Sequence, residues 1–107
     1  MNNSELQELV LSLMEQGKEG EYWDFKQEWH DDIADLLKDI ICFANTVHSK
    51  DCYIIFGVAD DLTVTGMAKA RRKQADIIDA ISNLVFARDI YPKIELTTVN
   101  VNGKDVD

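Results

Sequence analysis

The chain has 107 residues, of which 46% are apolar and 29% are charged. This length allows one domain with a modest hydrophobic core, and the composition excludes a collagen, a coiled-coil array and a disordered tail. No apolar run approaches the roughly 20 residues that a membrane span needs, and the first residues lack the basic start of a signal peptide. We therefore expect one domain over residues 1–107, in the cytoplasm and with no membrane partner.

The net charge is −9, from 11 basic and 20 acidic residues. Residues 1–61 hold 14 acids and 4 bases, a net charge of −10, whereas residues 62–107 hold 6 acids and 7 bases, a net charge of +1. An acidic surface repels phosphates, so nucleic acid cannot wrap the whole molecule. Any phosphate-binding face must come mostly from the second half of the chain.

Two segments of the first half show the 3.6-residue period of amphipathic helices. Ser4 and Gln7 have the spacing of a capping box, and the helix that they begin ends at Gly17. A second helix follows from Asp31, because apolar residues recur at helical spacing over the next four turns. Its apolar stripe consists of Ile33, Leu36, Leu37, Ile40, Phe43, Ala44 and Val47.

Between these helices lies a short segment, residues 19–26, that has the pattern of a strand. Alternate side chains of a strand point to opposite faces of the sheet. Trp23 and Phe25 therefore share an apolar face, while Asp24 and Lys26 share the other face. We predict that the first face belongs to the core and that the second carries function.

The middle of the chain predicts a buried strand and then an acidic turn. Residues 52–58 are nearly all apolar, which is typical of a strand that is buried on both faces. Asp60 follows this strand directly, and residues 62–67 have the pattern of a further short strand. Cys42 and Cys52 both lie in apolar patterns, so we expect small core residues rather than a disulfide.

The last third of the chain predicts one helix, one strand and a turn. Pro92 separates the helix from a strand over residues 93–101, and Asn102-Gly103 is a strong signal for a type I′ hairpin turn. Residues 104–107 are too few for a full returning strand, so we expect the chain to be the N-terminal piece of a longer protein. The apolar stripe of the helix consists of Ile77, Ile78, Ile81, Leu84 and Val85.

Acidic residues gather around the strand 19–26 and the turn after the next strand. Carboxylates within about 4–6 Å repel one another unless a cation joins them, so this group predicts an Mg²⁺ or Mn²⁺ site for phosphodiester hydrolysis. A lysine on the same strand face would stabilise the developing charge of the phosphate. The alternative, a solvated strand edge with an ordinary Asp–Lys pair, is the commoner fate of such spacing. The group consists of Glu19, Glu21, Asp24, Lys26, Asp60 and Asp61.

A basic segment precedes the last predicted helix, where the backbone amides of the helix N-terminus would help to bind phosphates. The alternative is a solvated helix start. The two histidines, His30 and His48, show no zinc-ligand spacing with other histidines or cysteines and predict surface or loop positions. The candidate nucleic-acid contacts are Lys69, Arg71, Arg72 and Lys73, together with Lys26 of the strand.

Taken in order, several short motifs resemble the Schlafen-type Alba-like domain. The motif Glu-x-x-x-x-Asp-Phe-Lys runs over residues 19–26, and the helix ends in Phe-Ala-Asn-Thr at residues 43–46. An apolar strand then reads Ile-Ile-Phe-Gly-Val-Ala-Asp-Asp at residues 54–61, with Val-Thr-Gly at residues 64–66. The match covers about residues 5–100 and, as an ordered set, is fairly specific.

The resemblance implies a small domain that contains both helices and strands, of the α/β (α+β) class. In such a domain a small mixed β-sheet packs with about three helices. Such domains usually begin longer bacterial proteins described as transcriptional regulators or ATP-binding proteins, and nucleic acid, DNA or RNA, is their expected partner. The C-terminal domains of the same chain are further expected partners, and a homodimer is left open. ATP would bind in the full-length protein, with Asn45 and Thr46 as candidate nucleotide contacts.

In animal relatives the equivalent domain resembles a metal-dependent endoribonuclease with three carboxylates. This implies Glu19, Asp24 and Asp60 as ligands of Mg²⁺ or Mn²⁺, although another alignment places Ala59 at the third position. The chain also departs from the family pattern, because residues 47–51 replace the usual Gly-Gly pair and Asp24 stands where Glu is common. A glycine-free loop lets a phosphate approach the backbone amides less closely.

Three functions are therefore open. We favour a non-catalytic nucleic-acid-binding module, because it needs only a local basic face and is compatible with the missing glycines. A metal-dependent endoribonuclease that uses Glu19, Asp24, Lys26 and Asp60 is the second hypothesis. A nucleotide-sensing or protein-docking domain is the third.

Overall fold

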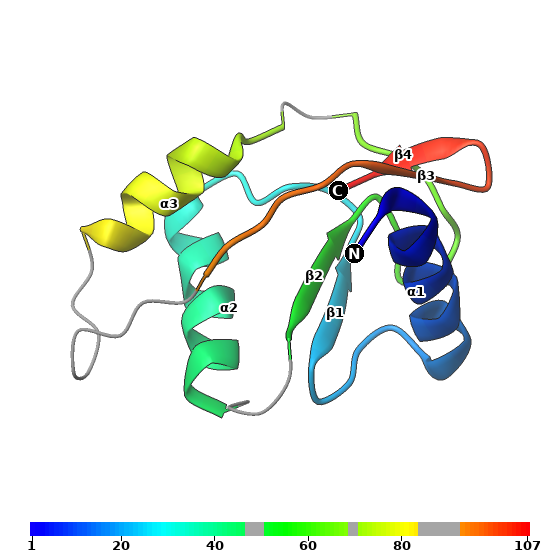
Figure 1. Ribbon diagram of the computed structural model, residues 1–107, viewed down its shortest axis with the longest axis horizontal. Helices are drawn as coiled ribbons and strands as arrows, with labels where there is room; N and C mark the ends of the chain where they lie inside the picture. The colour runs from blue at the N-terminus through cyan, green and yellow to red at the C-terminus, as the bar shows by residue number, and fades with distance from the viewer. Residues whose placement is uncertain (47–50, 69–70, 84–92) are drawn as a thin grey trace.

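The structure, a computed structural model, describes residues 1–46, 51–68, 71–83 and 93–107. In this part of the chain, helices and short strands combine into an α+β fold with a small central pair of strands (Figure 1). This arrangement confirms the predicted fold class. The elements are α1 (Asn3–Gln16), β1 (Trp23–Lys26), α2 (Ile33–Thr46), β2 (Tyr53–Phe56), α3 (Gln74–Ser82), β3 (Val99–Val101) and β4 (Lys104–Val106).

The strands form one parallel and one antiparallel pair. β1 and β2 are parallel, with Asp24 opposite Ile54, whereas β3 and β4 are antiparallel. The backbone groups of Phe56 and Asp107 exchange hydrogen bonds of 2.8 and 3.1 Å, which link the end of β2 to the end of β4. The two pairs are thereby joined into a mixed arrangement.

The hairpin between β3 and β4 confirms the predicted turn. Asn102 and Gly103 have φ angles of 54° and 83°, the left-handed conformation that a type I′ turn requires at both positions. Residues 104–106 nevertheless form a short returning strand, because Lys104–Val106 pairs as β4 with the three residues of β3. Val106, whose exposed fraction is 1%, is buried in the core, and this burial holds the short strand in place.

The start of α1 differs from the prediction by two residues. Asn2, not Ser4, is the N-cap, and its side chain accepts a hydrogen bond of 2.9 Å from the backbone N–H of Glu5. The Glu5 carboxylate accepts one of 3.3 Å from the N–H of Asn2, which completes the capping box. Gly17 ends the helix as predicted, with φ 130°.

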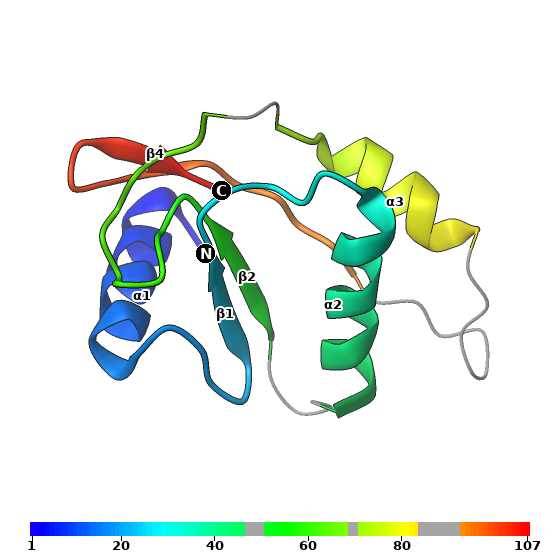
Figure 2. The same cartoon turned by 180° about the vertical axis from the view of Figure 1, so that it is seen from behind.

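Two apolar clusters lie on opposite sides of β1 and β2. Figures 1 and 2 show α1 on one side of these strands and α2 and α3 on the other. Ile55 belongs to the cluster on the α1 side, whereas its neighbour Phe56 belongs to the cluster beside α2 and α3. The first cluster is Val10, Leu13, Trp23, Phe25, Ile55, Val58, Val64, Val99, Val101 and Val106. The second is Trp29, Leu36, Phe56, Ile77 and Ile81.

Three strand predictions were too long. β1 begins at Trp23 rather than residue 19, and β2 covers Tyr53–Phe56 rather than residues 52–58. The last predicted strand is regular only over Val99–Val101.

The predicted strand at residues 62–67 is wrong, because this segment forms no regular strand and has one isolated bridge, between Val58 and Val64. Backbone hydrogen bonds from Ala59 to Thr63 and from Thr65 to Gly57 flank this bridge. The chain reverses at Leu62, with φ 68°.

Both cysteines are reduced, but their burial differs from the prediction. Neither Cys42 nor Cys52 forms a disulfide, as expected. Cys42 is exposed rather than a core residue, and Cys52 is half-buried. The predicted stripe residues Val47, Leu84 and Val85 lie outside the described residues.

Candidate functional site

The polar face of β1 carries an ion pair between Asp24 and Lys26. The burial pattern of the strand alternates, with Trp23 and Phe25 buried and Asp24 and Lys26 half-buried on the opposite face. The ammonium nitrogen Nζ of Lys26 lies 3.0 Å from Oδ2 of Asp24. This hydrogen bond, with a smaller contribution from Asp39, raises the pKa of Lys26 above its ordinary value.

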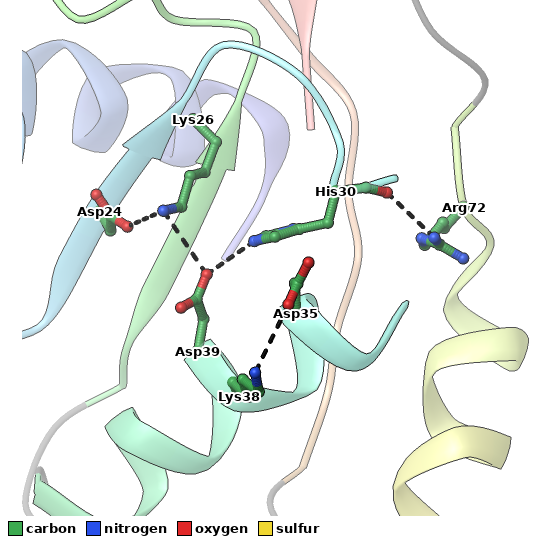
Figure 3. A network of polar contacts seen from close by, with 7 residues as sticks. All are labelled: Asp24, Lys26, His30, Asp35, Lys38, Asp39 and Arg72. Atoms are coloured by element: carbon green, nitrogen blue, oxygen red, sulfur yellow. Dashed lines mark hydrogen bonds and ion pairs between the residues drawn. The ribbon is translucent and has the colours of Figure 1, made fainter. Parts of the chain in front are cut away.

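The same lysine connects β1 to α2 (Figure 3). Its Nζ is 3.7 Å from Oδ2 of Asp39, and this oxygen is also 2.8 Å from Nε2 of His30. Asp39 and His30 were not among the predicted site residues, and no local pattern indicates them. Asp39 meets Lys26 only because α2 packs beside β1, and His30 joins them through its contact with Asp39.

One carboxylate oxygen of this network has no hydrogen-bond partner. Oδ1 of Asp24 is buried, while the whole side chain is 18% exposed. A buried carboxylate oxygen without a donor is costly, and a bound cation or the donor of a polar ligand would satisfy it. Asp24 is therefore the member of the predicted acidic group whose surroundings best suit a ligand.

The other two predicted acids lie around Lys18 instead. The carbonyl of Lys18 accepts a hydrogen bond of 3.0 Å from the N–H of Phe25, and Glu19 forms an isolated antiparallel bridge with Asp24. The Lys18 ammonium is 2.7 Å from Oδ1 of Asp60. The contact with Asp60, with smaller effects of Asp24 and Glu19, raises the pKa of Lys18.

This donor set does not fit a three-carboxylate metal site. Within the described residues, no three His, Cys, Asp or Glu side chains come together in a way that could hold a metal ion. Asp60 is paired with an ammonium group, and its side chain is 85% exposed. Two different lysines pair with these acids, Lys18 with Asp60 and Lys26 with Asp24.

The basic segment before α3 is held against the rest of the molecule. Arg72 donates hydrogen bonds of 3.1 Å to the carbonyls of His30 and Asp31, which tie it to the loop before α2. Nε of Arg71 lies 3.2 Å from Oδ2 of Asp107. Lys73 is exposed and is the N-cap residue of α3. The remaining predicted contact, at position 69, lies outside the described residues.

The two predicted nucleotide contacts lie at the C-terminal end of α2. Asn45 is exposed, and the structure describes the backbone of Thr46 as the last residue of the helix. The C-terminal end of a helix carries the negative end of its dipole, which disfavours a phosphate. The position therefore gives no support to nucleotide binding, which stays a prediction.

A comparison with protein families decides what this chain is. The model of the family described as Schlafen, AlbA_2 matches residues 19–106, which is most of the chain. The chain belongs to the Schlafen AlbA_2 family. No curated protein and no solved structure matches it.

Membership of this family agrees with the resemblance that the motifs carry, and the match includes β1, α2, β2, α3 and the hairpin. It supports nucleic-acid binding as the broad function of this Schlafen AlbA_2 domain. None of the helices in the described ranges has the length and apolarity that crossing a bilayer requires.

Proposed function

We propose that this Schlafen AlbA_2 domain binds nucleic acid through the basic segment that leads into α3. The observation that supports the proposal best is the family match over residues 19–106. The local charge is consistent with it, because residues 62–107 carry a net charge of +1 in a chain of net charge −9. Contacts of this kind bind the phosphate backbone and therefore contribute little to sequence specificity.

The segment has features that suit phosphate contacts. Arg71 is 42% exposed on its side chain, and Lys73 is exposed at the start of a nine-residue helix. A helix N-terminus carries the positive end of the helix dipole and so adds to the attraction of a phosphate. Arg72 has a different role, because its guanidinium is hydrogen-bonded to two backbone carbonyls and anchors the segment.

The binding experiment is fluorescence anisotropy with labelled single-stranded RNA, single-stranded DNA and duplex DNA at 50 and 200 mM salt. We expect micromolar affinity that falls with salt, which is the range of non-specific contacts. Arg71→Gln and Lys73→Gln should each weaken binding several-fold. Lys38→Gln is the matched control, since Lys38 is an exposed lysine of α2 that pairs only loosely with Asp35, at 3.9 Å.

Two outcomes would contradict the proposal. The first is a wild-type protein that binds none of the three probes at 50 mM salt. The second is an affinity that falls equally in the Lys38→Gln control, because the binding would then depend on total charge rather than on this segment. Arg72 is not a suitable probe, since its replacement would also release the loop at His30 and Asp31.

A metal-dependent endoribonuclease is the second candidate function. The pairing of Asp24 with Lys26 and the unpartnered Oδ1 of Asp24 favour it. The pairing of Asp60 with Lys18 disfavours it, because an ammonium group already occupies the carboxylate that would be the third metal ligand. Cleavage of labelled RNA with Mn²⁺ or with EDTA tests it, and metal-dependent cleavage that Asp24→Asn abolishes would support it.

The finer roles suggested by the resemblance remain proposals. An ATP-responsive regulator would respond to ATP in the full-length protein, through a shift of its melting temperature. A protein-docking role would agree with the strongly acidic first half of the chain. These roles predict no dependence on Arg71 and Lys73, so the same two variants separate them from nucleic-acid binding.

A further inference from the structure

The carboxylate of Asp107 is a buried acid that the site described so far does not use. Asp107 follows β4, and its backbone exchanges two hydrogen bonds with Phe56 of β2. Its side chain is only 3% exposed. A carboxylate is buried to this extent only when several donors satisfy it, so its partners define what it does.

Three donors surround this carboxylate, one from its own hairpin and two from distant parts of the chain. Nε1 of Trp29 donates a hydrogen bond of 3.0 Å to Oδ2, and the hydroxyl of Thr98 donates to Oδ1. The third is Nε of Arg71, 3.2 Å from Oδ2. Trp29 is itself fixed by the core, because its ring stacks on that of Phe56 with centroids 4.0 Å apart. The carboxylate therefore has little freedom to move.

The contact engages only one edge of the Arg71 guanidinium. A guanidinium has further N–H donors besides Nε, and 42% of the Arg71 side chain is exposed, so its outer edge can contact another anion. The neighbouring Arg72 is fixed at the same time by the carbonyls of His30 and Asp31. The segment 71–73 is thus held at two points beside the start of α3.

We propose that Asp107 is a positioning residue, which holds Arg71 so that the outer edge of its guanidinium contacts a backbone phosphate of bound nucleic acid. The proposal rests on the nucleic-acid binding proposed above. An unrestrained arginine loses rotamer freedom when it binds, and a residue that fixes it beforehand removes this cost. The gain corresponds to roughly two- to tenfold in affinity.

The direction in which one substitution changes the binding affinity distinguishes this positioning role from simple electrostatics. Asp107→Asn removes a negative charge beside the phosphate, which by Coulomb attraction alone would tighten binding. Positioning predicts the opposite, because the neutral amide no longer holds the guanidinium by an ionic hydrogen bond. We expect Asp107→Asn to weaken binding of labelled single-stranded RNA about two- to tenfold at 50 mM salt.

Asp105→Asn is the matched control, since Asp105 is an exposed acid on β4 of the same hairpin. This variant should bind as tightly as the wild type or slightly more tightly. The comparison is made at a temperature where near-ultraviolet circular dichroism shows both variants to be folded. If Asp107→Asn does not fold, Arg71→Lys takes its place, because lysine keeps the charge but lacks the Nε contact, and it should weaken binding to a similar extent.

A double-mutant cycle with Arg71→Gln excludes a merely structural role. If Asp107 acts through Arg71, Asp107→Asn should have no further effect on affinity in the Arg71→Gln background. Equal or tighter binding by folded Asp107→Asn overturns the inference, even when Arg71→Gln weakens binding and the proposed function holds. A wild-type protein that binds no nucleic acid overturns both together.

Discussion

Lys26 acts as the cation between a strand acid and a helix acid. Its Nζ lies 3.0 Å from Asp24 and 3.7 Å from Asp39, and His30 contacts the same oxygen of Asp39. Because the two acids come from β1 and α2, this single side chain contributes to the packing of the helix against the strand. Figure 3 shows that the network continues through the backbone of His30 to Arg72.

The raised pKa of Lys26 predicts a pH dependence of stability. The ordinary pKa of a lysine is 10.5, and the folded protein holds the pKa of Lys26 above that value, mainly through the hydrogen bond with Asp24. The ion pair therefore stabilises the folded state below the unfolded pKa and ceases to do so as pH rises through the folded pKa. In urea unfolding at pH 8 and at pH 11, Lys26→Met should lose less stability between the two pH values than the wild type. Identical losses in the two proteins would contradict this assignment, and Lys38→Met is the control.

The pairing of Lys18 with Asp60 predicts how replacing this lysine changes the affinity for a divalent cation. The ammonium group of Lys18 repels a divalent cation that approaches Asp60, although water screens this repulsion because both side chains are exposed. Lys18→Met should therefore raise the weak affinity of these acids for Mn²⁺ by a small factor, measured by titration calorimetry. Lys38→Met, which removes an exposed lysine that contacts Asp35 instead, should leave Mn²⁺ binding unchanged. A wild type that binds Mn²⁺ as tightly as Lys18→Met would show that Lys18 does not compete with the metal.

At the scale of elements, the fold depends on α1 closing one face of β1 and β2. Val10 and Leu13 of the helix share a cluster with Phe25 of β1 and Ile55 of β2. Phe25 is 1% exposed, whereas Leu11 of the same helix is 38% exposed. The same chain thus offers a buried and an exposed apolar residue for comparison.

Phe25→Ala should lower the free energy of unfolding by about 3–5 kcal/mol, because it removes a large buried ring and leaves a cavity. Leu11→Ala should change it by no more than about 0.5 kcal/mol. Urea denaturation followed by tryptophan fluorescence measures both, since Trp23 and Trp29 are buried. If Phe25→Ala is unfolded in water, Phe25→Leu supplies a smaller loss of the same sign. Equal effects of Phe25→Ala and Leu11→Ala would contradict the placement of α1.

At the scale of the whole molecule, charge limits how tightly nucleic acid can bind. The net charge is −9, and the exposed cations proposed to contact phosphates are few. For single strands, the logarithm of the binding constant falls with the logarithm of salt concentration by about 0.7 for each phosphate neutralised. The two proposed contacts, Arg71 and Lys73, therefore predict a slope of about −1.4.

Anisotropy titrations between 50 and 300 mM salt give this slope. Arg71→Gln should reduce its magnitude by about 0.7, because one phosphate contact is lost. A slope of −5 or steeper in the wild type would require a basic surface much larger than residues 71–73. Lys38→Gln should leave the slope unchanged.

The amino-acid sequence by itself determined the order of the main elements and which of their side chains share a face. The periods of 3.6 and 2 residues are local properties, so α1, α2 and β1 follow from neighbouring residues alone, as do the shared faces of Asp24 and Lys26. The Asn102-Gly103 turn and the family motifs are likewise local. The capping box was misplaced because two overlapping patterns, at Asn2 and at Ser4, both satisfy the same local rule.

The tertiary structure alone decided which charged groups pair. Lys18 with Asp60, Asp39 with Lys26, and Asp107 with Arg71 join residues that are 42, 13 and 36 positions apart. Such pairs depend on how helices and strands pack, and no local period records that packing. The acid group that the spacing predicted as one metal site is for this reason divided, with Asp60 paired to Lys18 and Asp24 paired to Lys26.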